Sequence, residues 1–186
     1  PRVRVYPFGV DLGAFTVAPG VTLPADLARI PRPRAGYVGG LHRHLATDWL
    51  AAAARTLPSV SFVLIGPRQA DAPTGPLDAL PNVHFLGQRE HDLLPAYMSG
   101  FDVGLIPYEL NAYTRSAVPT KLFEYLAARV PVVSTALPEV LGLPLGRTAI
   151  RIAHDAEELA RAIRDFVEGP RDEAALAESR RVAQLY

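Results

Sequence analysis

The amino-acid sequence predicts an α/β fold: a Rossmann-like, doubly wound parallel sheet of about six strands with helices on both faces. Three observations support this prediction. Short apolar runs alternate with stretches of helical periodicity along most of the 186 residues. The apolar runs show no polar alternation, as expected for strands with both faces covered. The composition, 49% hydrophobic and 20% charged, is typical of a globular domain.

Six apolar runs are expected to form the strands. In chain order they are residues 35–38, 61–65, 83–86, 102–106, 130–134 and 149–152. Periodicity between them predicts helices over residues 47–57, 90–98 and 120–128, and Trp49 in the first helix is expected in the core. Because helices connect successive strands, these units indicate βαβ crossovers, which join parallel strands.

The two ends of the chain differ in character. Asp155 and Glu158 form a capping-box-like pair, and apolar residues follow at helical spacing until Gly169 and Pro170 end the helix. A second helix is expected from Arg171 onward. Near the start, residues 2–6 read as a strand and the proline-rich residues 19–33 as a connection.

We interpret residues 1–186 as one domain, with residues 1–33 as an interdomain segment and lead-in. The chain begins with Pro1 and stops at Tyr186 within a predicted helix, so we expect it to be a fragment of a longer protein. No repeat with a period of about 20–50 residues is present.

Composition excludes several classes of partner. The 19 basic and 19 acidic side chains cancel, which argues against a nucleic-acid-binding protein. The absence of cysteine excludes disulfides and thiolate zinc sites and is consistent with the cytoplasm. No apolar run approaches the roughly 20 residues of a membrane helix.

The loops that follow the strands are the expected binding region. Open parallel sheets bind ligands beyond the carboxyl ends of their strands, where the strand order reverses. Glycine-containing loops follow the first three strands at residues 39–40, 66–67 and 87–89. The loop after the fourth strand, residues 107–118, is the longest, and it leads into residues 119–124.

Residues 119–124 carry the clearest chemical signal. Pro119 suits the first turn of a helix, whose free N–H groups and positive dipole end bind phosphate. Lys121, the only lysine in the chain, adds a charge there, and Glu124 lies on the same face, where it can bind a vicinal diol such as ribose. The alternative is an exposed ion pair worth a few tenths of a kcal/mol.

The sequence PTKLFEYLAARVPVVST at residues 119–135 resembles the donor-site signature of GT-B glycosyltransferases of the group-1 class. The resemblance continues in order over residues 5–168. Residues 9–15 resemble the passage from the acceptor domain to the donor domain, and four further segments resemble the first four strands: residues 37–40, 62–67, 80–87 and 102–107. This order of motifs is specific for the fold.

The resemblance implies a set of donor-binding residues. Lys121 would bind the diphosphate, Glu124 the ribose, and Gly39 and Gly40 would lie against the phosphates or the sugar. The remaining implied residues frame the base (Gly66, Pro67, Gln88, Arg89), face the transferred sugar (Asn111, Tyr113, Thr114, Arg115, Ser116) or open the helix (Pro119, Thr120).

The resemblance implies the C-terminal donor domain of an enzyme that transfers sugar from a nucleoside diphosphate, UDP favoured, to a glycan or lipid-linked acceptor. No metal or cofactor is expected. The general base would lie in an absent N-terminal acceptor domain, so we expect this chain alone to be inactive. The full-length enzyme is expected in the cytoplasm, where peripheral association with the inner face of the membrane is compatible with the resemblance.

Departures from the family pattern point to a subgroup. Ser116 stands where many retaining members carry the first glutamate of Glu-x7-Glu. Those members also carry Gly-Arg and a later Lys in the first loop, where this chain has Gly39-Gly40-Leu41-His42-Arg43. These features resemble cell-wall or exopolysaccharide enzymes. Two alternatives stay open: a sugar-nucleotide 2-epimerase of the same fold, and a non-catalytic nucleotide-sugar-binding module.

Some conspicuous residues have a plain interpretation. His42 and His44 form an H-x-H pair without a third ligand in view, so solvated loop histidines are favoured over a metal site. Tyr108 and Tyr113 either line the sugar pocket or pack the loop. We hypothesise that Arg115 selects a carboxylated or otherwise anionic donor sugar.

Overall fold

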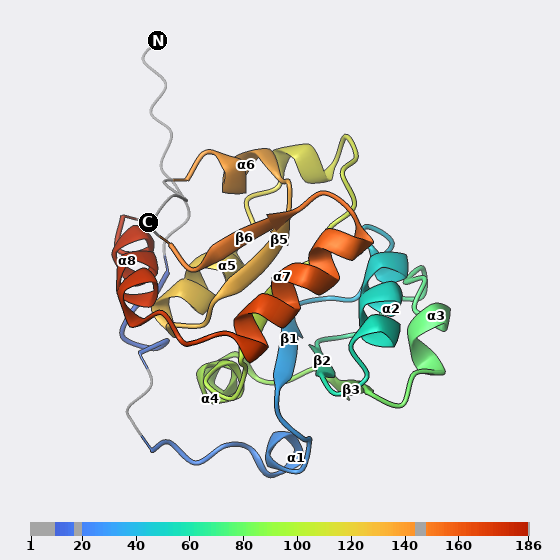
Figure 1. Ribbon diagram of the computed structural model, residues 1–186, viewed down its shortest axis with the longest axis horizontal. Coiled ribbons are helices and arrows are strands. Elements are labelled where there is room, and N and C mark those ends of the chain that lie inside the picture. The colour runs from blue at the N-terminus through green and yellow to red at the C-terminus, as the bar shows by residue number, and fades with distance from the viewer. Residues whose placement is uncertain (1–9, 17–19, 144–147, 186) are drawn as a thin grey trace.

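A computed structural model describes residues 10–16, 20–143 and 148–185 of the chain (Figure 1). Six parallel strands form one sheet in the order β3-β2-β1-β4-β5-β6, which confirms the predicted doubly wound fold. The strands are β1 Arg34–Val38, β2 Ser61–Ile65, β3 Val83–Gly87, β4 Val103–Ile106, β5 Val132–Thr135 and β6 Ile150–Ala153. The order reverses between β1 and β4, so a switch point lies there as predicted.

Helices connect the strands and cover the sheet. They are α1 Ala25–Ala28, α2 Thr47–Thr56, α3 Gly75–Asp78, α4 Leu94–Met98, α5 Thr120–Ala127, α6 Pro138–Leu141, α7 Ala156–Glu168 and α8 Glu173–Ala183, with 3-10 turns at η1 His91–Leu93 and η2 Thr114–Ser116. Helix α7 packs on α2, and α5 packs on α8. Within the described residues, no helix has both the length and the apolar character of a membrane span.

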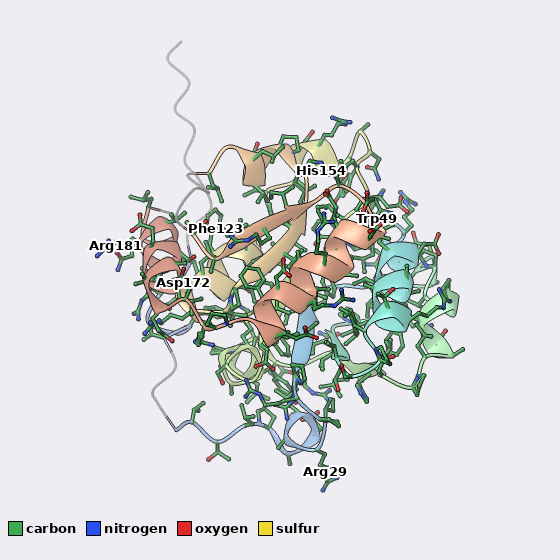
Figure 2. The ribbon with its side chains drawn as sticks, viewed as in Figure 1. Arg29, Trp49, Phe123, His154, Asp172 and Arg181 are labelled. Atoms are coloured by element: carbon green, nitrogen blue, oxygen red, sulfur yellow. The ribbon has the colours of Figure 1, made fainter. Side chains whose placement is uncertain are left out.

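Local chemistry explains where the helices depart from prediction. The helix predicted over residues 90–98 divides into η1 and α4, because Pro95 occupies the first turn of α4 instead of its interior. Helix α1 interrupts the predicted connection of residues 19–33, and the short α3 and α6 were not predicted. The strand predicted at residues 2–6 lies outside the described residues. Trp49 is partly buried at the edge of the core, beside α7 (Figure 2).

Two glycines at the centre of the sheet leave room for aromatic rings. Gly36 and Gly104 are opposite each other in the register. A Cβ on Gly36 would lie 2.2 Å from the ring of Phe101, and one on Gly104 would lie 2.8 Å from the ring of Tyr125. The rings of Phe101 and Tyr125 therefore pack directly against the backbone of the two strands.

The hydroxyl of Tyr125 fills the gap where β1 and β4 separate. The two strands pair only through Ala35↔Val103 and Gly36↔Gly104. Beyond this point the Tyr125 oxygen accepts a hydrogen bond from the Val38 N–H (2.9 Å) and donates one to the Gly36 carbonyl (3.2 Å). Complete burial raises the pKa of Tyr125, so the hydroxyl keeps its proton. Helix α5 is thereby fixed against the switch point.

Candidate functional site

Lys121 lies at the switch point, in the first turn of α5. Its Nζ donates a hydrogen bond to the Tyr108 hydroxyl and lies 4.9 Å from the centre of the Tyr108 ring and 5.3 Å from that of Tyr37. Aromatic faces stabilise an ammonium electrostatically without neutralising it. In the part of the chain that the structure describes, Lys121 forms no salt bridge. The Lys121 ammonium is thus held in place and remains available to bind an anion.

Glycine at position 39 makes room for this lysine. Its φ of +145° favours glycine, and a Cβ there would lie 2.9 Å from both Lys121 Cε and the Tyr37 hydroxyl. Gly66 has the same φ, and a Cβ on it would lie 2.0 Å from the Gly39 carbonyl oxygen. Gly66 therefore packs directly against the backbone of the loop after β1. The neighbouring Pro67 accepts a hydrogen bond from Leu41 N–H (2.9 Å).

A cavity of about 180 Å³ opens beside Lys121. It lies between the loops that follow β1 and β4, and its lining residues are His42, Tyr108, Tyr113, Thr114, Ala117, Val118, Pro119 and Lys121. Four of the residues expected to bind the donor are among them: Tyr113, Thr114, Pro119 and Lys121. Pro119 is the N-cap residue of α5 instead of a residue of its first turn.

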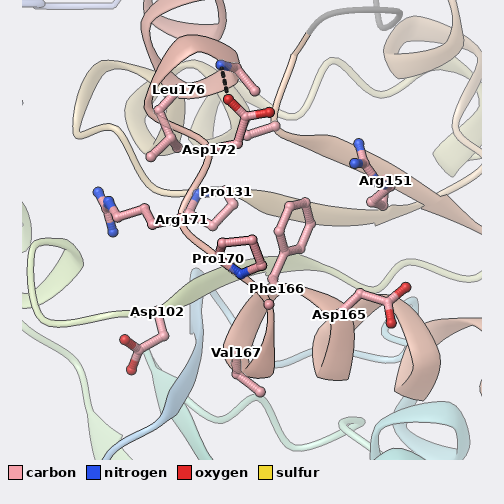
Figure 3. A pocket seen from close by; sticks show the side chains of 13 residues that line it. Asp102, Pro131, Arg151, Asp165, Phe166, Val167, Pro170, Arg171, Asp172 and Leu176 are labelled. Carbon is pink, nitrogen blue, oxygen red and sulfur yellow. Dashed lines mark hydrogen bonds between the residues drawn. The ribbon is translucent and has the colours of Figure 1, made fainter.

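A larger cavity of about 420 Å³ lies at the opposite edge of the sheet (Figure 3). It is lined by residues that precede β4, β5 and β6 and by the ends of α7 and α8. Two of its three acidic groups already have partners: Asp172 accepts from Ala175 N–H (2.9 Å), and Asp102 accepts from Arg34 N–H (2.7 Å). Because parallel sheets bind ligands at the carboxyl ends of their strands, the smaller cavity is the candidate site.

The loop between β4 and α5 is shaped by its own polar residues. The side-chain oxygen of Asn111 accepts hydrogen bonds from the N–H groups of Tyr113 (3.0 Å) and Thr114 (3.1 Å). Thr114 is buried, and its hydroxyl donates to the Glu109 carbonyl. Asn111 and Thr114 therefore fix the loop conformation. Arg115 and the neighbouring Ser116 are exposed and do not line the cavity.

Stacked rings join this loop to the loop after β1. His44 stacks on Tyr113 with ring centres 4.6 Å apart, and His42 stacks on Tyr108 at 5.7 Å. The expectation of a solvated loop histidine is wrong for His42, which is partly buried and forms one wall of the cavity. No signal near residue 42 in the sequence indicates its contact with Tyr108.

Glu124 lies one helical turn deeper than Lys121 and is partly buried. Burial raises the pKa of Glu124, while electrostatic interactions with His91 and Lys121 oppose that rise. Among the described residues, no group donates a hydrogen bond to its carboxylate. Burial of an unpaired carboxylate is costly, so this environment suits a ligand that brings hydroxyl donors. Glu124 does not line the 180 Å³ cavity itself.

The residues expected to frame the base are not gathered at the cavity. Gln88 is exposed. Arg89 donates to the carboxylate of Asp26 (2.7 Å) and to the Tyr97 hydroxyl (2.8 Å), which ties α1 to α4. The Arg89 guanidinium is therefore engaged within the domain. No cluster of three or more His, Asp or Glu side chains suited to a metal ion occurs among the described residues.

Comparison with known proteins places the chain in a family. The family model described as Glycosyl transferases group 1 matches residues 32–169, which is more than half of the chain. A curated protein of Bacillus subtilis (strain 168), "Putative teichuronic acid biosynthesis glycosyltransferase TuaH", is 37% identical over 105 residues. This match covers 55% of the chain and 26% of that protein.

Solved structures share the fold. HepE of Anabaena, solved in complex with UDP and glucose, superposes with a TM-score of 0.72 at 18% identity, over 95% of this chain and 50% of its own. Sucrose-phosphate synthase of Thermosynechococcus elongatus gives a TM-score of 0.71 at 22% identity, over 98% of this chain and 48% of its own. The chain thus spans about half the length of these solved proteins, and its match covers about a quarter of the curated one.

Proposed function

Because this chain belongs to the Glycosyl transferases group 1 family, we propose that it is the donor-binding domain of an enzyme that transfers sugar from a nucleoside diphosphate. The observation that carries the proposal is the ammonium of Lys121. It is held between Tyr37 and Tyr108 without a salt bridge among the described residues, at the start of α5 and beside a cavity at the switch point.

Lys121 and the start of α5 suit a diphosphate. The first N–H groups of a helix lack intrahelical acceptors, and the helix dipole places partial positive charge beside them. When a glycosidic bond breaks, negative charge grows on the phosphate that leaves. A fixed ammonium and fixed N–H donors stabilise that charge with little reorganisation. The proposal therefore requires no metal ion.

Glu124 suits the ribose of the same ligand. It lies three residues after Lys121, and α5 places residues at this spacing on one face. Its carboxylate has acceptor capacity for two adjacent hydroxyl groups and no competing donor within the described part of the chain. On this proposal, Lys121 binds the diphosphate and Glu124 binds the ribose.

UDP is the nucleoside diphosphate that we propose first, because HepE was solved with UDP and with glucose. The acceptor, a glycan or a lipid-linked glycan, would be bound by a second domain, together with the general base, in a cytoplasmic enzyme. On this proposal the 186-residue chain binds nucleotide and does not transfer sugar. Robust sugar transfer by the chain alone would contradict it.

A thermal-shift screen tests nucleotide binding directly. The chain is heated with UDP, GDP, ADP and their sugar derivatives, and a ligand at 100 times its Kd is expected to stabilise it by about 2.7 kcal/mol. We expect the uridine series to give the largest shift. The absence of a shift with every nucleotide at millimolar concentration would refute the proposal.

A further inference from the structure

The ring of His42 is held rigidly at the wall of the cavity. It stacks almost parallel to Tyr108, with an interplanar angle of 13° and ring centres 5.7 Å apart. Tyr108 in turn accepts the hydrogen bond from Lys121. His42, Tyr108 and Lys121 therefore form one continuous cluster along the cavity, built from the loop after β1, the loop after β4 and the first turn of α5.

The hydrogen bonds of His42 define which ring nitrogen carries hydrogen. Nδ1 accepts a hydrogen bond from the His44 backbone N–H at 3.1 Å, so Nδ1 has no hydrogen and the neutral ring carries it on Nε2. Nε2 is therefore the ring nitrogen that the loop does not use, on a side chain that lines the cavity. Within the described residues, nothing accepts a hydrogen bond from it.

The charges around His42 favour its neutral form. Partial burial lowers the pKa of His42, and electrostatic interactions with His44, Lys121 and Arg43 lower it further. Only Asp71 acts in the opposite direction. A neutral imidazole that accepts through Nδ1 offers one free group, the Nε2–H donor. Lys121 Nζ also offers only donors, so the cluster is complementary to an anion with several acceptor oxygens and not to a cation.

We infer that His42 is a donor-substrate-binding residue whose Nε2–H donates a hydrogen bond to a phosphate oxygen of the nucleoside diphosphate beside Lys121. This inference rests on the proposed function, because it assigns a second contact to the same ligand. Lys121 contributes a full positive charge, and the neutral His42 ring adds a single N–H donor whose direction is set by the stacking on Tyr108. His42 would thereby orient the diphosphate against Gly39 and Gly40.

Two substitutions separate ligand binding from support of the loop. In His42→Asn, the side-chain oxygen replaces Nδ1 and accepts from His44 N–H, but the donor at Nε2 is lost. In His42→Gln, the side-chain nitrogen reaches the position of Nε2 and restores the donor, but the acceptor at Nδ1 is lost. A purely structural role therefore predicts that Asn is tolerated and Gln is not. The inference predicts the reverse for ligand affinity.

Calorimetric titration of the parent and both variants with UDP is the test. A hydrogen bond to a charged group is worth about 1.5–3 kcal/mol, so His42→Asn is expected to weaken UDP binding by roughly tenfold or more. His42→Gln is expected to stay within about threefold of the parent. UDP affinity of His42→Asn equal to that of the parent, or equal losses in both variants, overturns the role of His42 and leaves the proposed function standing. If the parent binds no nucleoside diphosphate, both fall.

Nitrogen-detected NMR of the histidine rings gives an independent reading. His42 in the parent at pH 7 is expected as the neutral Nε2–H tautomer, and addition of UDP is expected to shift Nε2 more than Nδ1. His84 on β3 serves as the internal control, because it lies on the edge strand and outside the cavity. An Nδ1–H tautomer for His42, or an Nε2 signal unchanged at saturating UDP, contradicts the inference.

Discussion

Removal of the Tyr125 hydroxyl should destabilise the fold while leaving its packing intact. Tyr125→Phe keeps the ring that covers Gly104 but leaves the Val38 N–H and the Gly36 carbonyl without their partner. A buried polar group that loses its hydrogen bond costs about 1–3 kcal/mol. With two groups affected and some relaxation of β1, we expect a loss of about 2–3 kcal/mol, which lowers Tm by about 4–12 °C in a chain of this size.

Urea unfolding followed by circular dichroism measures this loss. The midpoint should fall for Tyr125→Phe with little change in slope, because the surface exposed on unfolding is unchanged. Tyr113→Phe is the matched control: Tyr113 is 67% exposed, and its hydroxyl makes no hydrogen bond with any described residue. If Tyr125→Phe costs no more than Tyr113→Phe, the hydroxyl does not hold the separation of β1 and β4.

Three further predictions concern Gly66, two partly buried histidines and Arg115. Gly66→Ala should lower the free energy of unfolding by several kcal/mol, because the φ of Gly66 is +145° and a Cβ there would lie 2.0 Å from the Gly39 carbonyl oxygen. Gly75→Ala on α3 is the control: its Cβ meets no atom within 4 Å, so urea unfolding should show a change of less than about 1 kcal/mol. The free energy of unfolding should fall as pH is lowered from 7 to 5, because burial lowers the pKa of His42 and His84 in the folded state and the unfolded chain therefore binds protons first. His84→Asn should make the free energy of unfolding less dependent on pH. An unchanged pH dependence in this variant would count against burial of His84 as a cause. Arg115→Ala should reduce the preference for UDP-glucuronate over UDP-glucose in binding titrations, because the exposed Arg115 guanidinium is unpaired among the described residues and can bind a carboxylate. Equal binding of the two nucleotide sugars, unchanged by the substitution, would contradict this hypothesis.

The sequence predicts the sheet well because each strand is a local signal. All six apolar runs form strands, with ends displaced by at most two residues. Helices α1, α3 and α6, which the sequence does not predict, have four residues each, too few for a periodic pattern. Their proline residues at or beside the first turn are compatible with a loop as well as with a helix. Local pattern alone does not decide between the two.

The position of Lys121 at the start of a helix beside the switch point is predictable from the sequence, whereas its aromatic contacts are not. Lys121 was identified because helix start, charge and long preceding loop lie together in the sequence. The stacking of His42 on Tyr108 and the ion pair of Arg89 with Asp26 join residues more than 60 positions apart. Such contacts depend on which strands are neighbours in the sheet. The same applies to the Tyr125 hydroxyl, whose partners lie on β1.

Calorimetric titration of Lys121→Ala and Glu124→Ala with UDP tests the central claim most directly. Arg181→Ala is the control, because Arg181 is 74% exposed on α8 and pairs only with Glu178 among the described residues (Figure 2). Lys121→Ala should weaken binding by tenfold or more, since a charged hydrogen bond is worth about 1.5–3 kcal/mol. Glu124→Ala should weaken binding similarly, and Arg181→Ala should stay within about twofold of the parent. Affinity within twofold of the parent in both site variants would contradict the assignment of this segment to the nucleotide.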